Sequence, residues 1–154
     1  MNKQEFIEKL TEERANVLKA IEGVSDVELV QPMAEGKWSI KDTLGHLTAW
    51  EAAVINAFEQ KARGERPTMP NLENLDAWNA EQAAKREGKS ADEVRHEFNE
   101  SRKRLLTIVS GLADDEGLWS PERSTAKMLS GLIHHDRHHW KALCEYRRLD
   151  CAES

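Results

Sequence analysis

Apolar residues recur every three or four positions along almost the whole chain, and this spacing constrains the fold more than any other feature of the sequence. It is the spacing of amphipathic helices, each with one apolar stripe. No stretch alternates apolar and polar residues with the β-branched enrichment that is typical of strands. The first stripe ends at Gly23, a residue suited to the end of a helix. Its members are Phe6, Ile7, Leu10, Val17, Leu18 and Ile21.

Two capping patterns predict where the next long helices begin. Ser39, with Asp42 three residues later, is a variant of the capping box, and the helix that it opens ends near Gly64. Ser90 and Glu93 form a cleaner capping box for a third long helix. The inner stripe of the second helix contains Ile40, Leu44, Leu47, Glu51, Val54, Ile55 and Phe58. The buried side of the third contains Val94, Phe98, Leu105, Ile108, Val109 and Leu112.

The last helix is predicted from roughly Thr125 to Arg148. Four long amphipathic helices without strands indicate an all-α four-helix bundle, and 154 residues suit a single domain over residues 1–154. The link from Gly64 to Ser90 is too long for a hairpin and includes a helical stretch over residues 71–87. We therefore expect a crossover connection that carries a short extra helix.

Charge and cysteine content restrict the expected partners and location. The net charge is -6 and no segment concentrates basic residues, so we expect no nucleic-acid partner and no membrane partner. No apolar run approaches the roughly 20 residues needed to cross a bilayer, and the N-terminal residues lack the apolar centre of a signal peptide. On a continuous helix, Cys144 and Cys151 would lie about 10 Å apart along the axis, too far to bridge. A reduced, cytoplasmic protein is expected.

The most unusual segment is Gly131–Trp140, because four of the six histidines lie between residues 134 and 139. Each residue of a helix turns about 100° from its predecessor. The inner face of this helix contains Met128, Leu129, Leu132, Ile133, Trp140, Leu143 and Tyr146. His139 and His135 lie about 40° and about 80° from its centre, whereas His134 and His138 point to solvent.

The inward pair has the spacing of metal ligands. Side chains at i and i+4 are about 5–6 Å apart at Cβ, so two imidazoles can converge on one ion with bonds of about 2.1 Å. The alternative is that His135 and His139 are core histidines, each hydrogen-bonded to a polar group. A third ligand would have to come from another helix. His46, on the flank of the second helix, is a candidate, whereas His96 is expected to be exposed.

The stretch KWSIKDTLGHLTAWE (Lys37–Glu51), followed by HDRHH (His135–His139), resembles the DinB-like (YfiT-like) superfamily. The segment LDAWNAEQ is similar to its ClbS/DfsB branch. The resemblance implies an up-down-down-up bundle that is often a homodimer. It also implies a divalent metal, commonly zinc or nickel, held by one histidine of the second helix and two of the last. By position these are His46, His135 and His139.

Members of this superfamily differ in chemistry. Some transfer low-molecular-weight thiols such as bacillithiol or mycothiol, one group isomerises maleylpyruvate with mycothiol, and one opens a cyclopropane in a genotoxin. The fold therefore does not name the small-molecule substrate. Three neutral histidines leave a divalent ion with an open coordination position, as in catalytic zinc sites. Such an ion lowers the pKa of a bound water or thiol to about 7, which supports hydrolysis and thiol transfer equally.

Two carboxylates on inner faces, Glu51 and Asp136, are candidate catalytic groups. Burying a carboxylate is unfavourable unless it is paired. The alternatives are a salt bridge to an inward-reaching arginine or lysine, a position nearer the rim of the bundle, or a role in orienting an imidazole. The charged run SRKRLL is interpreted as a solvated helix face, from which Arg104 is expected to reach over the core.

Trp50, Trp78 and Asn79 could line a pocket above the ion for the substrate or cofactor. Ordinary core packing is the favoured explanation for the tryptophans, and the alternative for Asn79 is a hydrogen bond to a neighbouring backbone group. The leading hypothesis is a metal-dependent hydrolase or thiol transferase that acts on a small electrophile. The rival is a metal-free protein that binds and sequesters a small apolar molecule. A third possibility is an interaction protein whose exposed histidines respond to pH.

Overall fold

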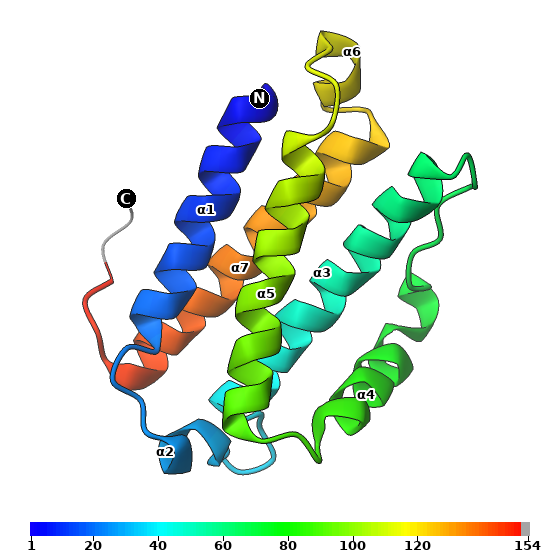
Figure 1. Cartoon of the computed structure of the whole chain (residues 1–154). Coiled ribbons are helices and arrows are strands. Elements are labelled where there is room, and N and C mark those ends of the chain that lie inside the picture. The colour runs from blue at the N-terminus through cyan, green and yellow to red at the C-terminus, as the bar shows by residue number, and fades with distance from the viewer. Residues whose placement is uncertain (152–154) are drawn as a thin grey trace. The chain divides into compact units, whose positions relative to one another are not determined.

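The protein is all-α, as the apolar periodicity predicts, in a computed structural model that describes residues 1–151. The four expected long helices are α1 (Lys3–Ala20), α3 (Ile40–Ala62), α5 (Ala91–Ser110) and α7 (Ser124–Arg147). The shorter elements are α2 (Asp26–Val30), the 3-10 helix η1 (Leu72–Asn74), α4 (Leu75–Arg86) and α6 (Glu116–Trp119). Figure 1 shows their course. No helix in the described part of the chain is both long and apolar enough to span a membrane.

Side chains cap the helices where the sequence predicts it. Ser39 accepts a hydrogen bond from the backbone N–H of Asp42, whose carboxylate accepts one from the backbone N–H of Ser39. The Ser90 hydroxyl accepts a hydrogen bond from the backbone N–H of Glu93 at the start of α5. Each cap satisfies an N–H group that has no partner within its own helix.

The chain forms two compact units, one of which contains Met1–Val24 and the residues from Leu106 onward. In this unit α1 and α7 lie side by side and run in the same direction (Figure 1). Arg14 contacts Asp136 near the middle of the pair, and Arg147 donates hydrogen bonds to the carbonyl groups of Ala20 and Glu22 at its end. The residue numbers of the contacts rise together, as they do only for parallel helices.

The second unit contains Ser25–Leu105. In it α3 and α5 also run in the same direction, because Glu51 pairs with Arg102 and, further along both helices, Glu59 pairs with Arg104. A connection between parallel helices must return along their length, and α4 makes this return antiparallel to α3. Trp78 packs on Trp50 of α3. The expected crossover with a short helix is confirmed.

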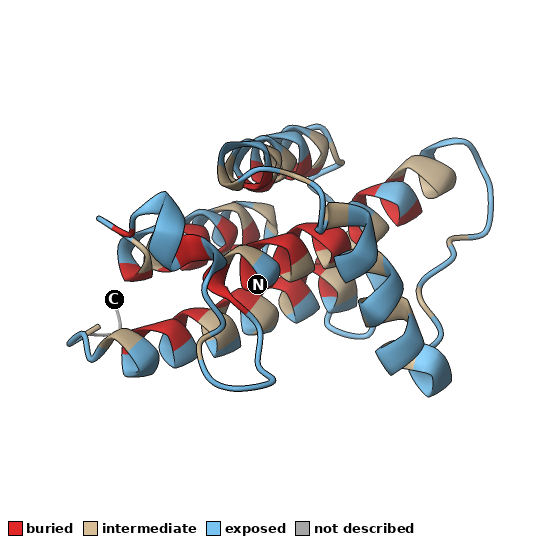
Figure 2. Cartoon of the chain, turned by 90° about the horizontal axis from the view of Figure 1, so that it is seen from below, coloured by how far each residue is buried: buried red, intermediate tan, exposed pale blue. Residues whose placement is uncertain are grey.

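Buried residues lie on one side of each long helix and exposed residues on the other (Figure 2). Most members of the predicted stripes are buried, among them Leu10, Leu44, Phe98 and Leu129. Leu18 and Tyr146 are exceptions, since they are 41% and 46% exposed. Both lie at the margin of their stripes, so a small rotation of the helix is enough to turn them to solvent.

The expectation of unpaired cysteines is wrong. Cys144 and Cys151 form a disulfide, with their Cα atoms 6.1 Å apart. The expectation assumed one continuous helix, but α7 ends at Arg147 and Arg148 adopts a left-handed conformation with φ 55°. The backbone N–H of Leu149 then donates to the carbonyl group of Cys144, which turns the chain back. The prediction of a single domain stays a prediction.

Candidate functional site

The histidines of α7 divide into an inner and an outer pair. His135 and His139 are half-buried, whereas His134 and His138 are exposed, which confirms the orientation predicted from helix rotation. The rings of His135 and His139 lie edge to face, with centroids 4.8 Å apart. The i,i+4 spacing therefore stacks two imidazoles on the same face of one helix, as a pair of ligands to one ion requires.

The surroundings of His139 keep its imidazole neutral. The pKa of His139 is lowered from 6.5 to about 4, mainly by burial and also by the neighbouring charge of His138, against a smaller opposite effect of Asp136. Only a neutral imidazole has a free lone pair for a metal ion. His139 can therefore act as a ligand over the whole neutral pH range.

Polar side chains of α1 hold the segment of α7 that carries this pair. Arg14 donates from Nη2 to Oδ1 of Asp136 at 3.3 Å and from Nε to Oδ2 at 3.5 Å, and both side chains are buried. Glu13 accepts hydrogen bonds from Trp140 Nε1 at 2.5 Å and from Arg137 Nη1 at 3.2 Å. Asp136 thus has the arginine partner that its burial demands, and its catalytic role stays a prediction.

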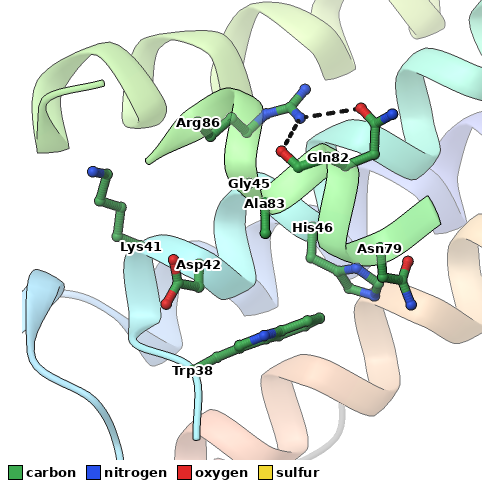
Figure 3. Close-up of a pocket in the computed structure, with 9 residues that line it drawn as sticks. All are labelled: Trp38, Lys41, Asp42, Gly45, His46, Asn79, Gln82, Ala83 and Arg86. Carbon is green, nitrogen blue, oxygen red and sulfur yellow. Dashed lines mark hydrogen bonds between the residues drawn. The ribbon is translucent and has the colours of Figure 1, made fainter. Parts of the chain in front are cut away.

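His46 lies in the second unit, in the second turn of α3, and is half-buried. Its ring packs on Trp38, with centroids 4.6 Å apart, and Trp38 directly precedes the N-cap of α3. Asn79 of α4 lies beside the His46 ring (Figure 3). The helix cap and the crossover helix together therefore set the surroundings of this imidazole.

The other sequence-predicted residues of this unit lie in two places. Trp50 and Trp78 pack on each other with ring centroids 4.7 Å apart, which links α3 to α4. Glu51 is fully buried and accepts a hydrogen bond from Arg102 Nε at 2.5 Å. A catalytic role of Glu51 and a pocket role of the tryptophans stay predictions.

Arg104 does not reach over the core, contrary to expectation. It is exposed and pairs with Glu59 at the surface. Of these two arginines of α5, Arg102 is the buried one because it continues the stripe of Phe98 and Leu105, at spacings of four and three residues, whereas Arg104 falls outside that stripe.

Sequence reasoning also missed the role of Gly45, which precedes His46. A Cβ atom at Gly45 would lie 2.9 Å from Cδ of Arg86, so the absent side chain lets α4 approach α3. Arg86 in turn pairs with Glu97 of α5 at 2.7 Å. Burial raises the pKa of Glu97, but hydrogen bonds from Lys89 and Arg86 outweigh it, so the pKa is lowered overall. A glycine inside a helix was the signal for this close approach.

Among the described residues, His46, His135 and His139 make up a group that could hold a metal ion. All its members are imidazoles, and the identity of a metal does not follow from them.

The model of the DinB superfamily matches residues 9–143. This span contains all three histidines and most of the chain, so the chain belongs to the DinB superfamily. Comparison with curated proteins finds no match.

Solved structures share the fold over nearly the whole chain. The colibactin self-resistance protein ClbS, in complex with double-stranded DNA, has a TM-score of 0.84 at 17% identity, with 96% of each chain covered. The sibling lethal factor precursor DfsB has a TM-score of 0.83 at 13% identity, also with 96% of each chain covered. A protein from Streptococcus pneumoniae has a TM-score of 0.82 at 12% identity, covering 97% of this chain and 92% of the other. These similarities confirm the expected bundle class and the expected ClbS/DfsB likeness.

One of these structures shows that our prediction of no nucleic-acid partner was wrong for this fold. We excluded a nucleic-acid partner because the net charge is -6, but ClbS, which has this fold, forms a complex with double-stranded DNA. The net charge is a poor guide because DNA contacts depend on local positive charge and on backbone N–H groups, not on the sum over the chain.

Proposed function

We propose that the chain is a metal-dependent enzyme that acts on a small electrophilic substrate, and that His46, His135 and His139 hold its divalent ion. The observation that carries this proposal is that each imidazole offers one ligand nitrogen and that these atoms lie within 4.8 Å of one another. Two ligands of one ion, with bonds of about 2.1 Å, are about 3–4 Å apart. The spacing is therefore close to that of a shared ion.

The donor set fits a catalytic ion better than a structural one. Structural zinc sites are closed by four protein ligands, usually with thiolates, whereas three imidazoles leave a position open. Nickel and zinc both accept imidazole ligands. When bound, the ion would act as a Lewis acid that makes a water molecule or a low-molecular-weight thiol nucleophilic at neutral pH.

The chain's own residues would position the site and exclude water. The contact of Arg14 with Asp136 holds the backbone next to His135, and the Arg102–Glu51 pair holds α3 against α5. We propose that Glu51 and Asp136 act by such orientation or by proton transfer, and that Trp50, Trp78 and Asn79 line the substrate pocket. A homodimer and a cytoplasmic location remain predictions.

Elemental analysis of untagged protein that has never met a nickel column or a chelator tests the proposal. We expect about one zinc or nickel ion per chain, which His135→Ala and His139→Ala remove while the circular dichroism spectrum is kept. His134→Ala and His138→Ala are matched controls, because they remove the exposed i,i+4 pair of the same helix and should leave the metal content unchanged.

The reaction type is tested with the metal-loaded protein. Conjugation of a low-molecular-weight thiol to a model electrophile would identify a transferase, and thiol-independent consumption of the electrophile would identify a hydrolase. If the purified protein contains no stoichiometric metal and the histidine variants bind apolar ligands as the wild type does, the enzyme proposal is wrong. Metal-free sequestration would then be the better description.

A further inference from the structure

Asn79 of α4 has a buried polar atom that the fold does not use. Its Oδ1 atom is buried and has no hydrogen-bond partner among the described residues. An unpaired buried acceptor is unfavourable, so proteins rarely keep one without a reason. Packing does not supply the reason, because no residue of α4 is buried and Asn79 itself is only half-buried.

Two contacts hold Asn79 in place. Directly before it, Trp78 packs on Trp50 of α3. Seven residues after it, Arg86 crosses Gly45 and pairs with Glu97. Positions seven apart lie on the same side of a helix, so α4 presents Asn79 and Arg86 on the side that faces α3. These contacts hold α4 against α3 on both sides of Asn79 along the helix.

Asn79 lines a narrow crevice together with Trp38 and His46 (Figure 3). The crevice has a volume of about 10 Å³, which is room for one water-sized group. The Trp38 ring, packed on His46, forms an apolar wall. Only a small polar group, such as a hydroxyl, an amide N–H or a water molecule, therefore fits beside the carboxamide.

The charged side chains that line this crevice already have hydrogen bonds within the protein. Lys41 donates to the carbonyl group of Glu87, and the Asp42 carboxylate accepts from the backbone N–H of Ser39. Arg86 donates to Gln82 and Glu97. The Asn79 oxygen is thus the acceptor that these contacts leave for a molecule from outside.

We infer that Asn79 is a substrate-binding residue, whose carboxamide oxygen accepts a hydrogen bond from an N–H or O–H group of the substrate beside the His46 imidazole. The substrate class is then an electrophile that carries a hydroxyl or an amide N–H next to its reactive atom. An ester or ketone without such a donor binds less well. This inference rests on the proposed function, because that proposal makes His46 a ligand at the reacting centre.

Small amides test the hydrogen bond directly by two-dimensional ¹H–¹⁵N NMR of the full chain. Acetamide carries the N–H donor, and N,N-dimethylacetamide lacks it. We expect acetamide to shift the side-chain amide signals of Asn79, and Asn79→Leu to weaken acetamide binding about tenfold, as the loss of one hydrogen bond predicts. The control is Asn99→Leu, an exposed asparagine of α5, which should bind as the wild type does.

Thermal unfolding separates a binding role from a structural one. Removing an unpaired buried acceptor should raise the melting temperature of Asn79→Leu by about 2–4 °C, whereas a structural role predicts a decrease. Equal responses to the two amides, a response to N,N-dimethylacetamide alone, or a lower melting temperature would overturn the inference. The two amides are compared on the wild type, so this comparison holds even if the variant fails to fold.

Elemental analysis of the same samples keeps the two proposals apart. A protein that contains metal but does not distinguish the two amides refutes the role of Asn79 alone. A protein that distinguishes them but contains no metal refutes the proposed function and leaves Asn79 as a ligand-binding residue.

Discussion

The ion pair of Glu51 and Arg102 gives the most demanding prediction for stability. Their side chains are 0% and 5% exposed, and Arg102 Nε lies 2.5 Å from Glu51 Oε2. At this distance two unit charges attract each other by about 7 kcal/mol at an effective dielectric constant of about 20. The removal of both charges from water costs a similar amount, so the net contribution of the pair is small. Each charge without the other is strongly unfavourable.

Arg102→Met should therefore lower the free energy of unfolding by about 3–5 kcal/mol, because it leaves a buried carboxylate without its guanidinium partner. The double variant Glu51→Leu, Arg102→Met should recover most of this loss and lie within about 1 kcal/mol of the wild type or above it. Arg104→Met is the matched control, since Arg104 lies two residues further along α5 and its side chain is 63% exposed. Its effect should stay below about 1 kcal/mol.

Urea denaturation at pH 7, followed by circular dichroism and by tryptophan fluorescence in the presence of a chelator, measures these differences. Coincident midpoints from the two probes justify a two-state analysis. If Arg102→Met is no less stable than Arg104→Met, the pair is not shielded from water. If the double variant is as unstable as the single one, packing rather than an uncompensated charge sets the loss. Either result would refute the reasoning.

Three further predictions follow from single features. The unfolded chain protonates His139 near pH 6.5 and the folded chain only near pH 4, so stability should fall by up to about 3 kcal/mol as the pH is lowered through this window. The urea midpoint, measured as a function of pH, should fall less steeply for His139→Gln than for the wild type. An equal slope for the two proteins would contradict the low pKa of His139. Reducing the Cys144–Cys151 disulfide, whose cysteines are seven residues apart, should lower the free energy of unfolding by about 2 kcal/mol through loop entropy. The wild type and the double variant Cys144→Ser, Cys151→Ser are compared with and without reductant. Equal stability of all forms would argue against the bond. Gly131→Ala should stabilise α7 by about 0.5–1 kcal/mol, because the new methyl group has no neighbouring atom within 4 Å outside its own helix. Gly45→Ala should not stabilise α3, because its Cβ would lie 2.9 Å from Cδ of Arg86. Equal thermal shifts for the two variants would show that α4 does not approach α3 so closely.

Features that depend on neighbours in sequence were predictable. Apolar spacing predicts the four long helices, and the capping boxes at Ser39 and Ser90 mark two of their starts. Helix rotation separates His135 and His139 from His134 and His138. In each case the interacting groups lie within one or two turns, so helix geometry alone relates sequence position to position in space.

Partners from distant parts of the sequence were not predictable. The sequence shows that buried carboxylates need a cation, but it does not show that Arg14 contacts Asp136 or that Arg102, rather than Arg104, contacts Glu51. The disulfide was missed because a single left-handed residue, Arg148, ends α7 before Cys151. One turn of backbone thus changed the distance between two side chains by several ångströms.

Local periodicity therefore determined the class of the fold, the long helices and the inner pair of histidines, because each depends on the repeat of a single helix. Only the tertiary structure decided which ions pair, how Gly45 lets α4 approach α3, and that Asn79 lies beside His46 with an unused acceptor. Those features depend on where whole helices pack, and packing is set by the shape and charge of surfaces that are far apart in the sequence.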